Sequence, residues 1–151
     1  MPHSLLEVYL HIVFSTRDRI PYFEDKKLRS RMHAYLGGLC NELKGPVVTV
    51  GGVEDHVHIA CKQSKHYAPK DFMRILKEKS SKWAKGVDSY LESFYWQTGY
   101  GMFSISPGHL SQLKRYIDQQ EEHHKTETFQ EEYRRLLDRY SVQYDERFLW
   151  D

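Results

Sequence analysis

The amino-acid sequence predicts an α+β fold, with an antiparallel sheet of the ferredoxin-like, split βαβ type. The first observation is the order of the apolar patterns, which read strand, helix, strand, strand, helix, strand and then two further helices. The second is that no Gly/Ser/Pro-rich linker or internal repeat divides the 151 residues, which indicates one domain over residues 1–151. In this topology both crossover helices cover one face of the sheet, and we expect one C-terminal helix, residues 106–125, to cover the other.

The strands are predicted by apolar runs rich in strand formers, and the helices by apolar residues that recur every three or four positions. The first strand has the strand period, because Leu10, Ile12 and Phe14 alternate with His11 and Val13. The expected strands are residues 5–15, 47–50, 55–61 and one within 94–106, and the expected helices are residues 24–43, 70–85, 106–125 and 129–140.

Three pairs of residues mark where elements begin or end. Gly45-Pro46 ends the first helix. Gly51-Gly52 is typical of a hairpin turn between the second and third strands. Ser106-Pro107 combines an N-cap residue with proline at the first helical position. We therefore expect one unbroken helix from residue 106 to about residue 125.

The composition excludes several classes of protein. No run approaches the roughly 18 apolar residues of a membrane span, and the N-terminus lacks the basic and apolar segments of a signal peptide. The only cysteines are Cys40 and Cys61, so we expect no disulfide framework and two reduced thiols in a cytoplasmic protein. The 40% hydrophobic and 28% charged residues are typical of a folded chain rather than a disordered one.

Positive charge is concentrated in the middle of the chain. Residues 62–85 contain eight Lys or Arg and two acidic residues, although the net charge of the whole chain is only +1. Such a block suits an anionic partner, but it is also typical of a solvated helix face. The candidates for phosphate contacts on the expected helix are Lys70, Arg74, Lys77 and Lys85.

His56-Val57-His58 is a candidate metal motif. Alternate residues of a strand point to opposite faces, so His56 and His58 point together to the face that the crossover helices leave open. Two neutral imidazoles at such positions can share one cation. The competing interpretation is a pair of half-exposed strand histidines without a ligand.

Tyr116 and Gln120 are candidates for chemistry on the third expected helix. Their spacing of four residues places them on one helical face. A tyrosine hydroxyl is a nucleophile when a cation or base helps it to lose its proton. The oxygen of a glutamine side chain is a hard, neutral ligand that suits Mg²⁺ or Mn²⁺. The competing interpretation is an interfacial core tyrosine and a surface glutamine.

Taken together, five segments resemble the single-tyrosine transposases of small bacterial insertion sequences. These enzymes belong to the His-hydrophobic-His nuclease superfamily and are related to REP-associated tyrosine transposases. The resemblance covers nearly the whole chain, and its most specific parts are the histidine pair and the tyrosine helix. The segments are His11-Ile12-Val13-Phe14-Ser15-Thr16-Arg17, Asp55-His56-Val57-His58, Trp96-Gln97-Thr98-Gly99-Tyr100-Gly101-Met102-Phe103-Ser104, residues 116–124, and residues 129–133 with Tyr144-Asp145.

The resemblance implies a transposase that cleaves and rejoins single-stranded DNA through a covalent 5′-phosphotyrosine intermediate and so moves an insertion sequence. Tyr116 resembles the nucleophile. His56, His58 and Gln120 resemble the ligands of a divalent metal, Mg²⁺ or Mn²⁺. The implied partners are hairpin ends of an insertion sequence and a second copy of the chain, in a homodimer whose tyrosine helices are candidates for exchange.

Two further residues are weaker candidates for supporting the site. Asp55 is placed to orient His56, although a turn or capping role fits it equally well. His123 falls near the expected face of Tyr116, although helix-end capping also fits it.

Two other classes of function compete with a transposase. A non-catalytic nucleic-acid-binding module on the same ferredoxin-like fold would use the sheet without chemistry, but it does not require the histidine pair together with Tyr116 and Gln120. A phosphodiesterase with two His-containing motifs would place Ser or Thr two residues after each His. Here His56 is followed at that position by His58, and no second motif is evident.

Overall fold

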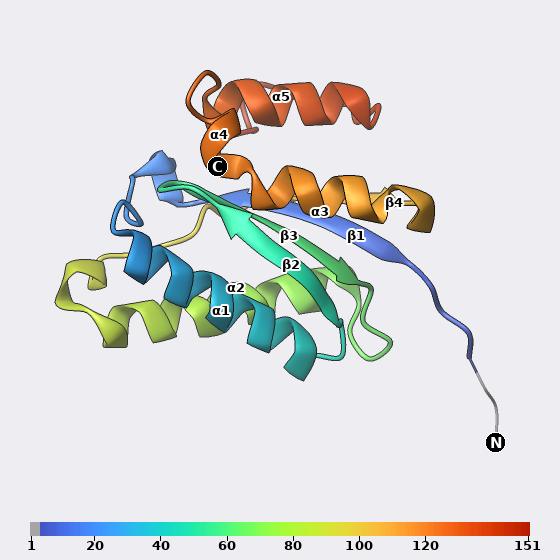
Figure 1. Ribbon diagram of the computed structural model, residues 1–151. Helices are drawn as coiled ribbons and strands as arrows, with labels where there is room; N and C mark the ends of the chain where they lie inside the picture. The colour runs from blue at the N-terminus through green and yellow to red at the C-terminus, as the bar shows by residue number, and fades with distance from the viewer. Residues whose placement is uncertain (1–3) are drawn as a thin grey trace.

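The computed structural model describes residues 4–151. Its centre is an antiparallel sheet of four strands in the order β2-β3-β1-β4 (Figure 1). The strands are β1 (Tyr9–Ser15), β2 (Val47–Gly52), β3 (His56–Lys62) and β4 (Gly101–Ile105). The first and third strands occupy the centre of the sheet, which confirms the ferredoxin-like, split βαβ arrangement expected from the order of the elements.

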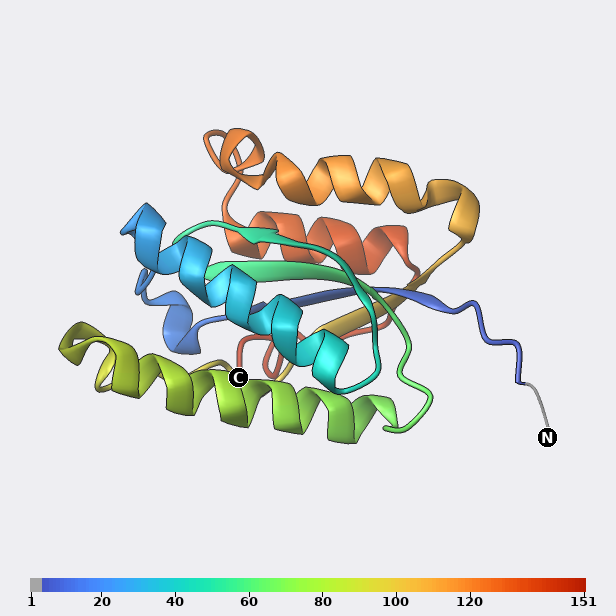
Figure 2. The ribbon, with the colours of Figure 1, turned by 60° about the horizontal axis from the view of Figure 1, so that its bottom comes forward.

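The helices α1 (Lys26–Glu42) and α2 (Pro69–Val87) cover one face of the sheet, as both ribbon views show (Figures 1 and 2). Asp25 fixes the start of α1, because its side chain accepts hydrogen bonds from the backbone N–H groups of Lys27 and Leu28. The main apolar core lies between these helices and the sheet. Its residues from the two central strands include Ile12, Phe14, Val57 and Ile59.

Three C-terminal helices cover the opposite face of the sheet. They are α3 (Leu110–Asp118), α4 (Gln120–His123) and α5 (Phe129–Arg139). Figures 1 and 2 show α3 and α5 side by side on this face. Apolar contacts hold them there, because α5 packs on Val13 and Phe103 while α3 packs on Ala60. A polar side chain that points from the centre of the sheet toward these helices is therefore removed from water.

The remaining elements are short. Three 3₁₀ helices connect the larger elements: η1 (Arg17–Arg19), η2 (Ser89–Leu91) and η3 (Pro107–His109). The first strand starts at Tyr9 rather than at residue 5. Cys40 and Cys61 are buried free thiols. No helix in the part of the chain that the structure describes has the length and apolar character needed to cross a membrane.

The prediction of a hairpin turn at Gly51-Gly52 is wrong. Both glycines belong to β2, and the chain turns over residues 53–55 before β3 begins. Gly51 is required for another reason, because a Cβ atom there would lie 2.4 Å from the carbonyl oxygen of Ile117. The missing side chain therefore lets α3 lie directly against the edge strand β2.

The prediction of one unbroken helix from residue 106 to residue 125 is also wrong. The helix begins with the 3₁₀ turn η3, and Gln119, with φ −105° and ψ 21°, separates α3 from the single turn of α4. The hydroxyl of Ser106 is hydrogen-bonded to Nδ1 of His109 over 2.6 Å and caps no backbone N–H group. Tyr116 and Gln120 consequently belong to two helices rather than to one continuous face.

Candidate active site

Three histidines of the sheet point toward the face that α3, α4 and α5 cover. His56 and His58 occupy alternate positions of β3, while Val57 between them enters the main core. His11 lies on the neighbouring strand β1, and its Nε2 is 2.8 Å from Nδ1 of His58. All three imidazoles are buried, so the interpretation of the pair as half-exposed strand histidines is wrong.

Glu132 lies at the centre of the site; the resemblance includes residues 129–133 but implies no role for this acid. It is fully buried and comes from the first turn of α5. Its Oε1 is 3.1 Å from Nε2 of His56 and 2.9 Å from Nε2 of His58. Nε2 of His124 is 3.0 Å from the same oxygen. A buried carboxylate that faces three imidazoles needs compensating positive charge.

Tyr116 and Gln120 contact the second oxygen of the same carboxylate. The Tyr116 hydroxyl donates a hydrogen bond to Oε2 of Glu132, and the amide nitrogen of Gln120 donates another over 2.9 Å. The Oε1 of Gln120 is also 3.1 Å from Nε2 of His56. The structure thus brings the candidate nucleophile and the three candidate metal ligands together around one acidic residue.

Asp55, His123 and Arg135 surround this cluster. The Oδ1 of Asp55 is 2.7 Å from Nδ1 of His56, which fixes the orientation of the ring. His123 stacks on Tyr116, with 4.6 Å between the ring centroids. Arg135 donates a hydrogen bond to the Tyr116 hydroxyl over 2.9 Å. Of the two adjacent histidines, His123 therefore supports the tyrosine ring, while His124 contacts the central carboxylate.

His56 compensates the negative charge of Glu132. Burial alone would lower the pKa of His56, but the hydrogen bonds to Asp55 and Glu132 outweigh burial and raise it to about 9. Burial alone would raise the pKa of Glu132, but His58, His124 and His56 together hold it far below its ordinary range. Burial lowers the pKa of His58. At neutral pH a protonated His56 therefore lies between two carboxylates, beside a neutral His58.

Tyr116 does not ionise readily in this arrangement. Burial and the negative charge of Glu132 raise the pKa of Tyr116 above its ordinary value, and Arg135 offsets only part of this effect. A divalent cation beside Glu132 reverses the sign of the local charge and favours the phenolate. The hydroxyl therefore requires additional positive charge before it can act as a nucleophile at neutral pH.

The same groups fit a divalent cation. One ring nitrogen each of His56 and His58 and one oxygen of Glu132 lie within 4.8 Å of one another. Two imidazoles and a carboxylate are a common donor set for divalent metals. An imidazole must be deprotonated to bind a metal, so the proton on His56 and the cation compete for the same nitrogen. A bound metal would offset the energetic cost of burying the Glu132 charge, as the proton on His56 does in the metal-free protein.

The four basic residues of the expected second helix border a groove of about 820 Å³ between α2 and residues 95–100. Lys70 is exposed, and Arg74 lies 3.5 Å from a carboxylate oxygen of Glu78. The Nζ of Lys85 is 3.7 Å from the ring centroid of Tyr95. These three cations border a surface that also presents aromatic rings, a combination that suits nucleic acid.

Lys77 has a different environment from the other three. Its Nζ donates hydrogen bonds to the backbone oxygens of Gln97, Thr98 and Gly99, over 2.8, 3.1 and 2.6 Å. Burial lowers the pKa of Lys77 to about 8. Lys77 therefore fixes the segment before β4, which forms one wall of the groove.

A signal for Glu132 does exist in the sequence. The apolar residues Phe129, Tyr133 and Leu136 form the buried stripe of α5, and Glu132 lies on that stripe. An acidic residue at a core-facing position of an amphipathic helix needs a buried partner. The charge on this apolar stripe is the feature that distinguishes Glu132 from the other residues of the segment.

Solved structures with the same fold define the class of protein. A presumed transposase from Deinococcus radiodurans R1 is similar with a TM-score of 0.60 and 17% identity, over 80% of this chain and 96% of that chain. A REP-associated tyrosine transposase bound to a REP hairpin is similar with a TM-score of 0.54 and 10% identity, over 78% of this chain and 68% of that chain. At these identities the likeness establishes the fold, which is that of tyrosine transposases.

The sequence then gives the family. The family model described as "Transposase IS200 like" matches residues 4–120, so the chain belongs to the IS200-like transposase family. This confirms the resemblance read from the motifs. No curated protein matches the chain. The matched residues include the histidine pair, Tyr116 and Gln120, but they end before α5, so Glu132 lies outside them.

Proposed function

We propose that the protein cleaves and rejoins single-stranded DNA through a covalent 5′-phosphotyrosine at Tyr116, and thereby moves an insertion sequence. The family supports this class of reaction. The observation that carries the assignment of residues is that Tyr116 shares the buried carboxylate of Glu132 with His56 and His58. A module that only binds nucleic acid has no need for a nucleophile, two imidazoles and an acid to converge at one buried point.

Cleavage is one substitution at phosphorus. A bond forms between the Tyr116 oxygen and phosphorus, and the bond from phosphorus to the 3′ oxygen of the preceding nucleotide breaks. The phenolic proton is lost to solvent, and the departing 3′ oxygen takes up a proton from solvent. Rejoining reverses the substitution with a different 3′ hydroxyl. The phosphotyrosine link conserves the energy of the phosphodiester bond, so no nucleotide cofactor is needed.

We further propose that Mg²⁺ or Mn²⁺ is held by His56, His58 and Gln120, with Glu132 as an additional oxygen ligand. When bound, the cation polarises the scissile phosphate and stabilises the negative charge that develops on it. Asp55 would keep Nε2 of His56 directed at the ligand position, since it is hydrogen-bonded to the other ring nitrogen.

The proposed DNA partner is a hairpin end of the element. A REP-associated transposase of similar fold was solved with a REP hairpin, which supports this choice. The groove beside α2 offers a path for phosphates, with Lys70, Arg74 and Lys85 as contacts and Lys77 holding its wall. Contacts of this kind are electrostatic and weaken with salt.

We also propose a homodimer, because the resemblance to insertion-sequence enzymes implies one. In the described chain α3 lies on its own sheet and carries Tyr116 to its own Glu132. Each chain would therefore complete its own site. A confirmed heterodimer of Tyr116→Phe and His56→Ala chains is then expected to form no covalent adduct. Recovery of the adduct in that heterodimer would mean that α3 is exchanged between chains.

The test is a covalent-adduct assay. The protein is incubated with Mn²⁺ and a labelled pool of single-stranded DNA hairpins with randomised flanks, and the products are separated on a denaturing gel. The wild type should form a labelled protein band that Tyr116→Phe abolishes, since phenylalanine keeps the ring but lacks the nucleophilic oxygen. The matched control Tyr90→Phe changes an exposed tyrosine and should leave the band unchanged. A normal band from Tyr116→Phe would overturn the proposal.

A further inference from the structure

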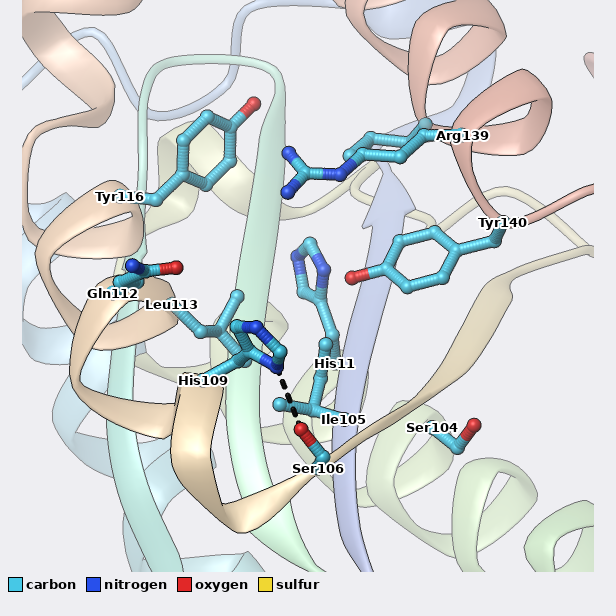
Figure 3. A pocket seen from close by; sticks show the side chains of 11 residues that line it. His11, Ser104, Ile105, Ser106, His109, Gln112, Leu113, Tyr116, Arg139 and Tyr140 are labelled. Carbon is cyan, nitrogen blue, oxygen red and sulfur yellow. Dashed lines mark hydrogen bonds between the residues drawn. The ribbon is translucent and has the colours of Figure 1, made fainter.

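A cavity of about 370 Å³ lies directly beside Tyr116, outside the His-Glu cluster (Figure 3). It opens between β4, the first part of α3 and the C-terminal end of α5. Its walls include apolar side chains such as Leu113, the rings of Tyr116 and Tyr140, and the guanidinium of Arg139. This volume is within the range of roughly 300–1,000 Å³ that is usual for sites that bind small molecules.

His11 supplies a polar atom without a partner at this cavity. Its side chain is 1% exposed, and its Nδ1 forms no hydrogen bond within residues 4–151. The other ring nitrogen is committed to Nδ1 of His58, over 2.8 Å. The rings of Tyr116 and Tyr140 lie on either side of the imidazole, with centroids 6.4 and 6.3 Å away. A buried polar atom of this kind is costly unless a ligand or water satisfies it.

Arg139 and Tyr140 give the cavity its electrostatic character. No acidic side chain lines it, and in residues 4–151 no carboxylate forms an ion pair with Arg139. The ring of Tyr140 is held by parallel stacking on Phe103, at 4.3 Å between centroids. Figure 3 shows its hydroxyl directed toward His11, with the Arg139 guanidinium reaching in between the two tyrosines. The cavity therefore presents one cation and several polar groups to an anionic ligand.

We propose that this cavity binds one unpaired nucleotide of the DNA strand, next to the phosphate that Tyr116 attacks. The nucleotide's phosphate binds Arg139 and the Tyr140 hydroxyl, and its base packs against the aromatic and apolar walls. Such stacking accepts any base, so it positions the strand without reading its sequence. That the nucleotide belongs to the DNA substrate rests on the proposed function. The expected affinity for a nucleotide rests on the cavity itself.

Because the cavity adjoins Tyr116, a nucleotide bound there would position the neighbouring phosphodiester for reaction. The ring that forms one wall of the cavity carries the hydroxyl that is hydrogen-bonded to Glu132. A nucleotide bound against this ring keeps the neighbouring phosphodiester from moving away from the hydroxyl. Holding two reacting groups at a fixed separation accelerates their reaction without any new chemistry. Arg139 is accordingly a positioning residue for the strand rather than a catalytic residue.

The test uses thymidine 3′,5′-bisphosphate, a single nucleotide that contains two phosphomonoesters and no phosphodiester linkage. Calorimetric titrations are carried out in EDTA, so that no metal can hold the phosphates. The wild type should bind the probe, and Arg139→Gln should weaken binding by at least about tenfold, because it removes a charge-assisted hydrogen bond. Tyr140→Phe should weaken it by roughly threefold to tenfold. The matched control Arg147→Gln changes an exposed arginine that pairs with Asp145 and should bind like the wild type.

A second readout locates the probe. In a long-range ¹H–¹⁵N spectrum of the histidine rings, the Nδ1 signal of His11 should shift when the probe is added to the wild type. Absence of binding by the wild type, equal binding by Arg139→Gln, or an unchanged His11 signal would each overturn the proposal. If the probe binds as expected but the wild type forms no covalent adduct with DNA, the proposed transposase reaction fails and the nucleotide site stands.

Discussion

Tyr116 on α3 donates a hydrogen bond to Glu132 on α5, and this contact joins the two helices over the buried centre of the sheet. The other oxygen of the same carboxylate faces His56 and His58. Burial and the charge of Glu132 together raise the pKa of Tyr116, while a proton on His56 compensates that charge. The candidate nucleophile and the candidate metal ligands therefore form one electrostatic unit, and a change at one residue affects all of them.

Glu132→Gln tests this coupling, because glutamine keeps the shape of the side chain and removes its charge. We expect the affinity for Mn²⁺ to fall by at least about tenfold, since a carboxylate ligand is lost. We also expect the pKa of Tyr116 to fall in the metal-free protein, because the neighbouring negative charge is gone. Calorimetry measures the first effect and ultraviolet titration of the phenolate the second. Glu131→Gln, an exposed change on the same helix, is the control; a pKa of Tyr116 that stays the same in Glu132→Gln would argue against the coupling.

Metal binding should depend on pH through His56. Below about pH 9 the metal-free protein holds a proton on this imidazole, and that proton must leave before the nitrogen can bind a metal. The apparent affinity for Mn²⁺ should therefore rise about tenfold per pH unit between pH 7 and pH 8, and level off above pH 9. Asp55→Asn should move this dependence to lower pH, because Asp55 helps to raise the pKa. Calorimetric titrations in buffers with different ionisation enthalpies count the protons released on metal binding. An affinity for Mn²⁺ that does not vary between pH 7 and pH 8 would contradict the assignment of His56 as a ligand that must lose a proton.

The proton on His11 should change its position when a metal binds. In the metal-free site the neutral His58 donates from Nε2 to Glu132, so its Nδ1 accepts a hydrogen bond and His11 carries its proton on Nε2. If Nε2 of His58 instead binds Mg²⁺, its proton moves to Nδ1, and His11 then carries its own proton on Nδ1. The ¹⁵N shifts of the two His11 nitrogens should exchange their protonated and unprotonated values during a Mg²⁺ titration. The same tautomer of His11 before and after saturation would rule out this relay.

The groove beside α2 should account for part of the salt dependence of DNA binding. Removing two phosphate contacts with Arg74→Gln and Lys85→Gln together should reduce the log–log slope for single-stranded DNA by roughly 1.4. Lys77 is left intact in this experiment, because it holds the backbone of residues 97–99 and its loss would alter the groove itself. Fluorescence anisotropy at several salt concentrations gives the slope. Equal slopes of log affinity against log salt concentration for the double variant and the wild type would mean that these residues are ordinary solvated surface and do not contact DNA.

Much of the fold could be predicted from the sequence, because each strand and long helix has a clear apolar period. The errors fell where a distant contact decides the local structure. The Gly51-Gly52 pair predicts a turn, whereas the absence of a side chain at Gly51 lets Ile117 of α3 approach, a contact that no local pattern reveals. The break at Gln119 has no local signal either; after it, Gln120 contacts Glu132 and His56, which are distant in the sequence.

The candidate site was predicted only where a motif exists. His56 and His58 could be paired because strand geometry fixes their common face, and Tyr116 and Gln120 because they share a short segment. Glu132 could not be joined to them by spacing, since it comes from another helix and lies more than seventy residues after the histidines. Its only local signal is a carboxylate on the apolar stripe of α5.

The central claim is that Tyr116 forms the covalent bond to DNA, and peptide mapping of the adduct tests it most directly. After the DNA is trimmed with a nuclease and the protein is cut with trypsin, the peptide of residues 116–125 contains Tyr116 as its only tyrosine. The account predicts that the added nucleotide mass lies on this peptide and that fragmentation assigns it to Tyr116. Nucleotide mass on a peptide that carries Tyr133 or Tyr140 instead would contradict the account.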